Sequence, residues 1–287
     1  MTTDTSVQHP GTFQVRLVDR IAHWPWWLII IVLLGLIIFF NIISSQLYAD
    51  IFRRVSRGIV VSVGVAVIAY ASALVIGLIT ALGRVSKNVV AYNLSTLYVQ
   101  IIRGVPILVQ IIYVAFVITP AIVALLNAIG LALAPVLGPN NFLATMTLQD
   151  ISSEARVTIA LAIAYGGFEA ETFRAGIESI GRGQMEAARS LGMTYFQAMR
   201  YIILPQAFRR VLPPLGNDFI SMIKDSSLVS ILGVRDMTQE ARLYAAASFR
   251  YLETYSVLAF NYLVLTFTLS LGVKALENRL SKGGKGS

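Results

Sequence analysis

Residues 58–83 read GIVVSVGVAVIAYASALVIGLITALG and contain no charged side chain. A helix needs about 20 predominantly apolar residues to cross the hydrocarbon core of a bilayer, and this stretch is long enough. Its small residues, among them Gly64 and Gly77, let membrane helices approach each other closely. Residues 104–149 and 254–273 are two further charge-free stretches of about that length or more. The sequence therefore predicts an all-α integral membrane protein in which helix 58–83 packs centrally.

The composition supports this class and excludes several others. The 287 residues are 56% hydrophobic and 13% charged, with a mean hydropathy of +0.71, whereas soluble domains are about half apolar and a quarter charged. The chain has no cysteine, and its two histidines, His9 and His23, lie near the amino terminus, so we expect no metal site. The net charge of +8 is typical of basic cytoplasmic loops in a membrane protein, and no nucleic-acid partner is expected.

The amino-terminal region combines a polar segment with an apolar one. Residues 1–23 are predicted to be cytoplasmic, and residues 24–43, WPWWLIIIVLLGLIIFFNII, to form a transmembrane helix. Trp24, Trp26 and Trp27 suit the aromatic belt at a membrane interface. A secretory signal peptide is the alternative. The leader is long and no small-residue cleavage site follows, which favours an uncleaved span.

The number of spans depends on residues 104–149, which as one helix would be about 69 Å long. Prolines divide this stretch, so it holds either two spans or one span followed by an apolar external hairpin. With one span there, the chain has about six transmembrane helices and both termini lie on the same side. The remaining expected spans are residues 156–180, 215–234 and 254–276.

The distribution of basic residues favours the six-span topology. Arg and Lys are enriched in cytoplasmic loops, and with both termini inside about twice as many fall on the inside as on the outside. The cluster of Arg53, Arg54 and Arg57 falls outside and runs against this bias. An amphipathic segment lying on the membrane surface is one explanation for it. We therefore predict a multi-pass protein with both termini in the cytoplasm.

In this topology residues 181–214 form a basic cytoplasmic loop, with EAARSLGMTYFQAMRYIILP at residues 186–205. Helix propensity predicts a short helix over residues 185–191. Gly192 is expected to adopt the left-handed conformation that ends this helix. Thr194 is then expected to cap a second short helix that ends at the proline of the motif. The loop is thus predicted to be two short helices that meet at a glycine corner.

The surface of this loop suits a protein partner. Ala187 and Ala188 leave a flat area against which another protein can press closely, and Tyr195 and Phe196 are aromatic anchors of the kind that interfaces favour. The alternative is a loop that packs only under its own helices. The physical features alone favour neither interpretation.

The spacing within the loop fits the EAA pattern of type I, binding-protein-dependent ABC importer permeases: EAA, three residues, G, nine residues, I, one residue, LP. The matching residues are Glu186, Ala187, Ala188, Gly192, Ile202, Leu204 and Pro205. The chain also resembles the polar amino acid uptake branch of this family in IIRGVPILVQ from Ile101, EAETFRAGIESIGRGQMEAARSLG from Glu169 and KDSSLVSILGV from Lys224. The resemblance covers residues 58–279, which we interpret as the ABC permease transmembrane domain.

This resemblance implies a type I importer permease fold, to which residues 24–43 add an extra span and residues 119–149 an apolar excess. It implies a transporter subunit, not an enzyme, that passes polar amino acids across the plasma (inner) membrane of a prokaryote by alternating access. The seven matching loop residues then form the ATPase coupling site. The implied partners are a dimer of cytoplasmic ATP-binding cassette subunits, a second permease subunit, identical or homologous, and an extracytoplasmic solute-binding protein.

No nucleotide site is predicted in the chain itself. A phosphate-binding loop needs GxxxxGK[ST] before a helix, and the nearest sequence is the terminal SKGGKGS. We expect residues 280–287 to be a flexible tail, and ATP and Mg to be bound by the partner ATPase. A permease for another small solute, such as methionine or an organic anion, is one alternative. An ATPase-independent channel or secondary transporter is another.

Charged residues inside the predicted spans point to the solute path. Counted along their helices at about 1.5 Å per residue, Glu169, Lys224 and Asp225 lie in the middle to inner half of the bilayer. One interpretation is that these groups bind the ammonium and carboxylate of an amino acid, with hydroxyl contacts from Ser226 and Ser227. The other interpretation is that the charges pair with one another.

Pairing is most direct for three further charges on the same predicted helix. Glu171 and Arg174 are three residues apart, and Arg174 and Glu178 four apart, so all three share one helical face. We therefore interpret Glu171, Arg174 and Glu178 as a structural charge ladder.

Overall fold

The computed structural model describes residues 26–283, and every regular element in this range is a helix. The chain forms two compact units, one that ends at Ala49 and one that begins at Asp50. In chain order the helices are α2 (Trp26–Ser44), α3 (Gln46–Ser56), α4 (Ile59–Arg84), α5 (Val89–Gly104), α6 (Ile107–Tyr113), η1 (Val114–Ile118), α7 (Thr119–Ala132), α8 (Ala134–Leu137), α9 (Phe142–Thr145), η2 (Leu148–Asp150), α10 (Ser153–Glu178), α11 (Arg182–Ser190), α12 (Tyr195–Ala198), η3 (Met199–Ile203), α13 (Leu204–Asp225), η4 (Ser226–Leu232), α14 (Met237–Ser248) and α15 (Tyr251–Gly283).

Helix α2 occupies the predicted extra span. Its 19 residues include none that is buried, and the helix is apolar on all sides. An apolar helix without a buried face is suited to lipid. Trp24 and the polar segment 1–23 lie outside the described residues.

Four helical stretches in residues 26–283 are long and apolar enough to cross a membrane, namely residues 26–44, 46–84, 107–132 and 251–278. The other two expected spans, 156–180 and 215–234, correspond to α10 and to α13 with η4. These helices carry charged side chains, some buried or half-buried, such as Glu169 and Asp218, and others exposed, such as Lys224, and these charges lower their mean hydropathy. An all-helical membrane protein with several long apolar helices is confirmed.

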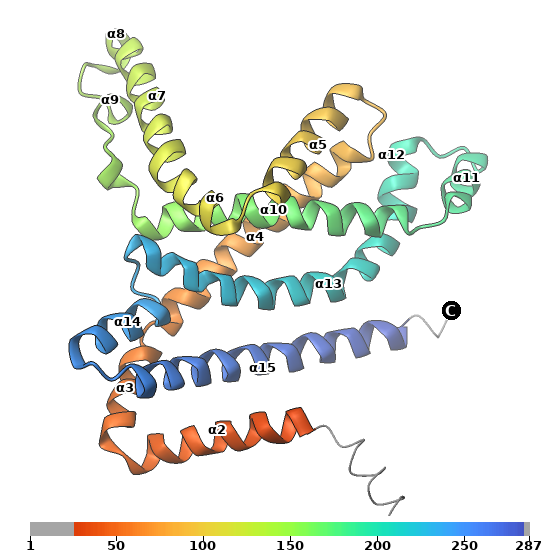
Figure 1. Cartoon of the computed structure of the whole chain (residues 1–287). Coiled ribbons are helices and arrows are strands. Elements are labelled where there is room, and N and C mark those ends of the chain that lie inside the picture. Colours follow the sequence, from red (N-terminus) through yellow and green to blue (C-terminus); the bar gives the residue numbers. More distant parts are fainter. Residues whose placement is uncertain (1–25, 284–287) are drawn as a thin grey trace, which may run out of the picture. The chain divides into compact units, whose positions relative to one another are not determined.

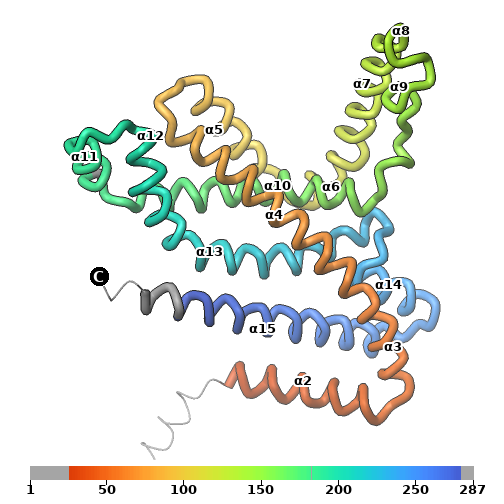
Figure 2. Tube along the Cα trace, turned by 180° about the vertical axis from the view of Figure 1, so that it is seen from behind, coloured from red at the N-terminus to blue at the C-terminus, as the bar shows by residue number. Residues whose placement is uncertain are grey.

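The core of the second unit lies between α4 and α10. A Cβ added to Gly77 of α4 would lie 2.6 Å from the Glu169 Cβ and 3.0 Å from the Ala170 nitrogen, so the two helices touch at a position that only glycine fits. The central packing predicted for helix 58–83 is thus confirmed. Figures 1 and 2 both show α13 lying between α10 and α15.

Residues 104–149 form one long helix followed by a short hairpin. Helices α6, η1 and α7 are continuous from Ile107 to Ala132, and α8 and α9 follow as four-residue turns. Pro120 was expected to divide this stretch and does not. The π-helical turn η1 ends just before it, with the Thr119 N–H bonded to the Val114 carbonyl, and this wider turn accommodates the proline ring.

A second π-helical turn explains why the helix end expected at Pro205 is wrong. The second helix of the loop does not end there, because the π-helical turn η3 again precedes the proline and the Leu204 N–H donates to the Met199 carbonyl. Residues 195–225 are therefore continuously helical, and the loop expected over 181–214 is helical from Leu204 as part of α13. Helix α15 extends to Gly283, so the tail does not begin at residue 280.

Helix α5 was not expected. Asn88 caps it by accepting hydrogen bonds from the Val90 and Ala91 nitrogens at 2.9 and 3.1 Å, and it ends before Pro106, where Val105 is extended. It packs against both α4 and α10, and the Tyr98 hydroxyl donates to the Ile163 carbonyl. Helix α5 is therefore a separate helix that precedes the candidate span Ile107–Ala132.

Candidate functional site

The α11–α12 corner, residues 182–198, has the backbone that the sequence predicts. Gly192 adopts a φ of +82°, and the Met193 nitrogen donates to the Ala188 carbonyl, which is the usual way in which a helix ends at a left-handed glycine. Thr194 caps α12, and its side chain and that of Gln197 bond reciprocally to each other's backbone nitrogens. The corner is thus a defined turn between two short helices. Figure 1 shows it at the end of the second unit where α10 ends and α13 begins.

The seven motif residues divide into two groups. Glu186, Ala187 and Pro205 are exposed, and Gly192 forms the turn. In contrast, Ala188 is buried and Ile202 and Leu204 pack against the cluster of apolar side chains beneath the corner. The expectation that Ala188 contributes to an open flat surface is therefore wrong, because the helix turns this side chain inward.

Sequence reasoning missed a large apolar side chain on the outer surface of the corner. Leu191, between α11 and the glycine, is 81% exposed, and Phe196 is 70% exposed. Two large apolar groups of this exposure on one turn suit a surface that binds a partner. Its position next to a left-handed glycine was the available signal, since a residue there is displayed rather than buried.

The corner is fastened to two long helices. Ile177 and Ile180 at the end of α10 pack with Met199 and Ile203, which lead into α13. The Arg210 guanidinium donates to the Ser179 carbonyl at 2.6 Å. A displacement of the corner would therefore move the ends of α10 and α13 together.

The Glu171 carboxylate lies close to arginines from three helices. Glu171 of α10 forms ion pairs with Arg84 of α4 and Arg174 of its own helix, and the Arg103 guanidinium of α5 lies 4.0 Å away. Arg174 also pairs with Glu178. The ladder along α10 is thus part of a network that links three helices, and Arg84 and Arg103 are members that the sequence reasoning did not include.

The expected solute-path residues are not brought together as one cluster. Glu169 is fully buried, and neither of its carboxylate oxygens has a hydrogen-bond partner within residues 26–283. Asp225 accepts a hydrogen bond of 2.8 Å from the Tyr165 hydroxyl, whereas Lys224 is exposed and forms no ion pair in the described chain. The Ser226 hydroxyl donates to the Ile223 carbonyl, and Ser227 is half-buried.

Three groups near Glu169 were missed. Asp218 lies close enough to repel the Glu169 carboxylate, and the Tyr70 and Tyr165 rings also interact with it. Asp218 and Asp225 are seven residues apart, which places them on one face of α13, and this spacing was a signal in the sequence. Acidic groups of α10 and α13 thus face one another. No group of three His, Cys, Asp or Glu side chains suited to a metal is found in residues 26–283.

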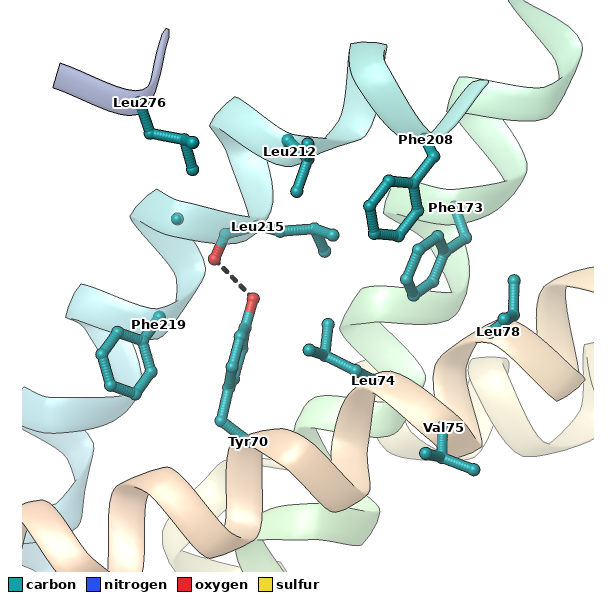
Figure 3. Close-up of a pocket in the computed structure, with 11 residues that line it drawn as sticks. Tyr70, Leu74, Val75, Leu78, Phe173, Phe208, Leu212, Leu215, Phe219 and Leu276 are labelled. Carbon is teal, nitrogen blue, oxygen red and sulfur yellow. Dashed lines mark hydrogen bonds between the residues drawn. The ribbon is translucent and has the colours of Figure 1, made fainter. Parts of the chain in front are cut away.

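An apolar pocket lies beside these groups. It has a volume of about 380 Å³, which is within the range of small-molecule sites, and Tyr70 forms part of its wall. Figure 3 shows the Tyr70 hydroxyl bonded to the Leu215 carbonyl, with Phe173, Phe208 and Phe219 on the surrounding walls. The pocket is built from α4, α10, α13 and α15. The corner and the charge network connect the first three of these helices but not α15.

Residues 73–282 match the family described as "Binding-protein-dependent transport system inner membrane component". The chain belongs to this family. It is a permease subunit in the inner membrane that works in an ABC transporter complex with ATPase subunits and a binding protein, and it is not itself the ATPase. A channel or secondary transporter that needs no ATPase is thereby excluded.

The chain is similar to the probable glutamine ABC transporter permease protein GlnM of Bacillus subtilis, with 39% identity over 75% of this chain and 88% of that protein. It is 32% identical to the glutamine transport system permease protein GlnP of Escherichia coli over 78% of this chain and 91% of that protein. Among solved structures, one of an amino acid ABC transporter with histidines is 33% identical, with a TM-score of 0.65 over 83% of this chain and 97% of that one. The fold is also that of the methionine transporter MetNI, at 16% identity and a TM-score of 0.58.

Proposed function

We propose that this permease imports polar amino acids, with glutamine the first candidate. The observation that carries this assignment is the similarity to GlnM and GlnP, both named for glutamine, at 39% and 32% identity over most of their length. The similarity to a solved amino acid transporter at 33% identity supports it. The methionine transporter shares the fold at 16% identity, which gives no support for methionine as the solute.

The α11–α12 corner is proposed as the contact with a dimer of ATPase subunits. Its exposed Leu191 and Phe196 offer an apolar docking area, and its packing against α10 and α13 provides the mechanical connection. In this proposal the corner and both chain termini lie in the cytoplasm. The ATPase bears ATP and Mg, and its closure shifts the permease between inward-facing and outward-facing states. Such a shift requires that the ATPase bind the corner more tightly in one state.

The permease is proposed to act as a pair, with a second copy or a homologous permease, and to receive its solute from an extracytoplasmic binding protein. The solute path is proposed to run beside Glu169, with Asp218 and Asp225 on the facing helix and Ser226 and Ser227 just after the end of that helix. The acidic groups suit the ammonium of an amino acid. Lys224, which is exposed in the single subunit, is the candidate partner for the carboxylate.

The test of the proposed function uses the permease reconstituted in vesicles with its ATPase and binding protein. Uptake of glutamine driven by internal ATP, and stimulation of ATP hydrolysis by the glutamine-loaded binding protein, are the expected results. Arginine, histidine, cystine and methionine form the comparison panel. Uptake of methionine or an organic anion in place of polar amino acids would disprove the substrate class while leaving the ABC mechanism intact.

Glu169→Gln is expected to raise the KM of uptake by roughly tenfold to a hundredfold, because a hydrogen bond to a charged group is worth about 1.5–3 kcal/mol. Basal ATP hydrolysis should stay near the wild-type rate, since the corner is unchanged. Uptake kinetics in the same vesicles check this. The matched control is Glu178→Gln on the same helix, whose side chain is 54% exposed and whose KM should not change. An unchanged KM for Glu169→Gln would remove Glu169 from the path.

A further inference from the structure

A cavity of about 310 Å³ is lined by Asp50, Arg53, Arg54, Arg57 and Tyr244, and we name it the α3 arginine cavity. Three guanidinium groups thus face one carboxylate. Figure 1 shows α3 and α14 at the end of the second unit where α4 begins, opposite the α11–α12 corner. The cavity therefore lies away from the α11–α12 corner, and Glu169 is not among the residues that line it.

The positive charge of this cavity is not neutralised by the fold. Arg53 pairs with Asp50, but both side chains are about half exposed or more, so the pair is weak. The Arg54 Nε donates to Glu240 at 3.2 Å, and its guanidinium lies 5.8 Å from the centre of the Tyr244 ring. Arg57 is exposed, and its side chain has no ion pair or hydrogen bond within residues 26–283. At least one guanidinium is thus available for an external anion.

The cavity lies at the depth of lipid headgroups. Helix α4, which is apolar enough to span a membrane, begins at Ile59. At the helical rise, Arg57 lies about 3 Å and Arg53 about 9 Å from that residue. The headgroup layer on each side of a bilayer is about 5–7 Å thick beyond the hydrocarbon core. By this count Arg57 lies within the headgroup layer and Arg53 just beyond its outer edge, where a long side chain can still reach phosphates, and both lie outside the hydrocarbon core.

Helix α3 has a buried apolar face and an exposed basic face. Ile51 and Val55 are fully buried within the second unit, so the arginines lie on the exposed face of the helix. On the adjoining turn of α4, Val60 is 79% exposed and continues the surface in the direction of the hydrocarbon. A lipid whose headgroup occupies the cavity can thus rest its acyl chain on apolar side chains.

We propose that the α3 arginine cavity binds the phosphodiester headgroup of an anionic phospholipid. Guanidinium groups bind phosphate oxygens in pairs with charge-assisted hydrogen bonds, and tyrosine is favoured at the membrane interface. An acidic face of the binding protein is the other anionic partner at this end. The lipid is favoured because the cavity sits at headgroup depth and adjoins an exposed apolar surface. This site explains why the cluster runs against the charge bias of the rest of the chain.

The test uses the full-length permease purified with its ATPase subunits in a neutral detergent. Thermal stability is measured while dioleoyl-phosphatidylglycerol or dioleoyl-phosphatidylcholine is added, and retained lipid is counted by native mass spectrometry. Phosphatidylglycerol is expected to raise the melting midpoint more than phosphatidylcholine does. In Arg53→Gln/Arg57→Gln the apparent affinity for phosphatidylglycerol should fall roughly tenfold, the size of effect expected for lost charge-assisted contacts. Arg54 is retained because it also binds Glu240.

The control variant is Arg250→Gln, an exposed arginine that pairs with Glu253 outside the cavity, and it should respond to phosphatidylglycerol as the wild type does. Equal responses to the two lipids, or an unchanged response in the double variant, would overturn the proposal. So would equal stabilisation by inorganic phosphate alone, because the site would then take free phosphate. If the double variant loses only docking of the binding protein and keeps its lipid response, the cavity serves that protein and the proposal is also overturned.

Discussion

Replacing Gly192 by valine is expected to abolish uptake while the partner ATPase continues to hydrolyse ATP. Gly192 has a φ of +82°, a conformation that costs other residues about 1–2 kcal/mol and is least tolerated by β-branched side chains. Valine therefore forces the turn between α11 and α12 to change, which displaces the exposed Leu191 relative to α12. If the corner is the contact with the ATPase, as proposed, closure of the ATPase would then no longer be transmitted to α10 and α13, against which the corner packs.

A matched variant separates backbone strain from loss of space. No atom lies within 4 Å of a Cβ added at Gly192, so size alone is no obstacle. Gly192→Asn should keep most of the uptake, because asparagine adopts the left-handed conformation more readily than other residues. Uptake and ATP hydrolysis are measured in the same vesicles, with the amount of inserted permease as the reference. Wild-type uptake by Gly192→Val, or equal damage by Asn and Val, would contradict this account of the corner.

The parts of the fold that were predictable are those with local causes. Length and apolarity alone identify helix 58–83, and the polar sequence around Gly192 and Thr194 contains its own turn and cap. The helix end predicted at Pro205 was wrong, although proline usually ends a helix. A π-helical turn just before the proline removes the conflict, and nothing in the sequence of Met199–Ile203 announces that turn. Both π-helical turns in residues 26–283 immediately precede an X-Pro pair, which makes this a recurrent solution in the chain.

The parts of the site that were missed depend on contacts between helices. Asp218 and Tyr70 are distant in sequence from Glu169, and only the packing of α4 and α13 against α10 places them beside it. Lys224 was expected to join Asp225 and Glu169 because the three lie at similar depth in the predicted spans. On a helix, consecutive residues point about 100° apart, so one faces the Tyr165 hydroxyl while the other is exposed. Sequence position thus predicted the depth of these groups but not their direction.

The second large effect is expected for Glu171→Gln, which should destabilise the permease by roughly 2–3 kcal/mol. Removing one member of a buried ion pair costs about 3–5 kcal/mol, and the value is reduced here because Glu171 is 28% exposed. Loss of the carboxylate leaves the Arg84 guanidinium least compensated. The Arg84 side chain is 13% exposed, and its Nε is already buried without a hydrogen-bond partner within residues 26–283. The neighbouring parts of α4, α5 and α10 would then hold Arg84, Arg103 and Arg174 with one acid fewer. Thermal unfolding of the complex in detergent measures the loss.

The control lies on the same helix. Glu178 is 54% exposed and, within residues 26–283, pairs with Arg174, so Glu178→Gln should cost no more than about 0.5 kcal/mol, the usual value of an exposed pair four residues apart. If Arg84 is the group left unpaired, the double variant Glu171→Gln/Arg84→Gln should recover part of the stability, which a double-mutant cycle quantifies. Equal losses for Glu171→Gln and Glu178→Gln would mean that the network adds nothing beyond a surface ladder. A large loss that Arg84→Gln relieves would instead establish Glu171 as the charge that holds α4 to α10 at the end where the ATPase acts.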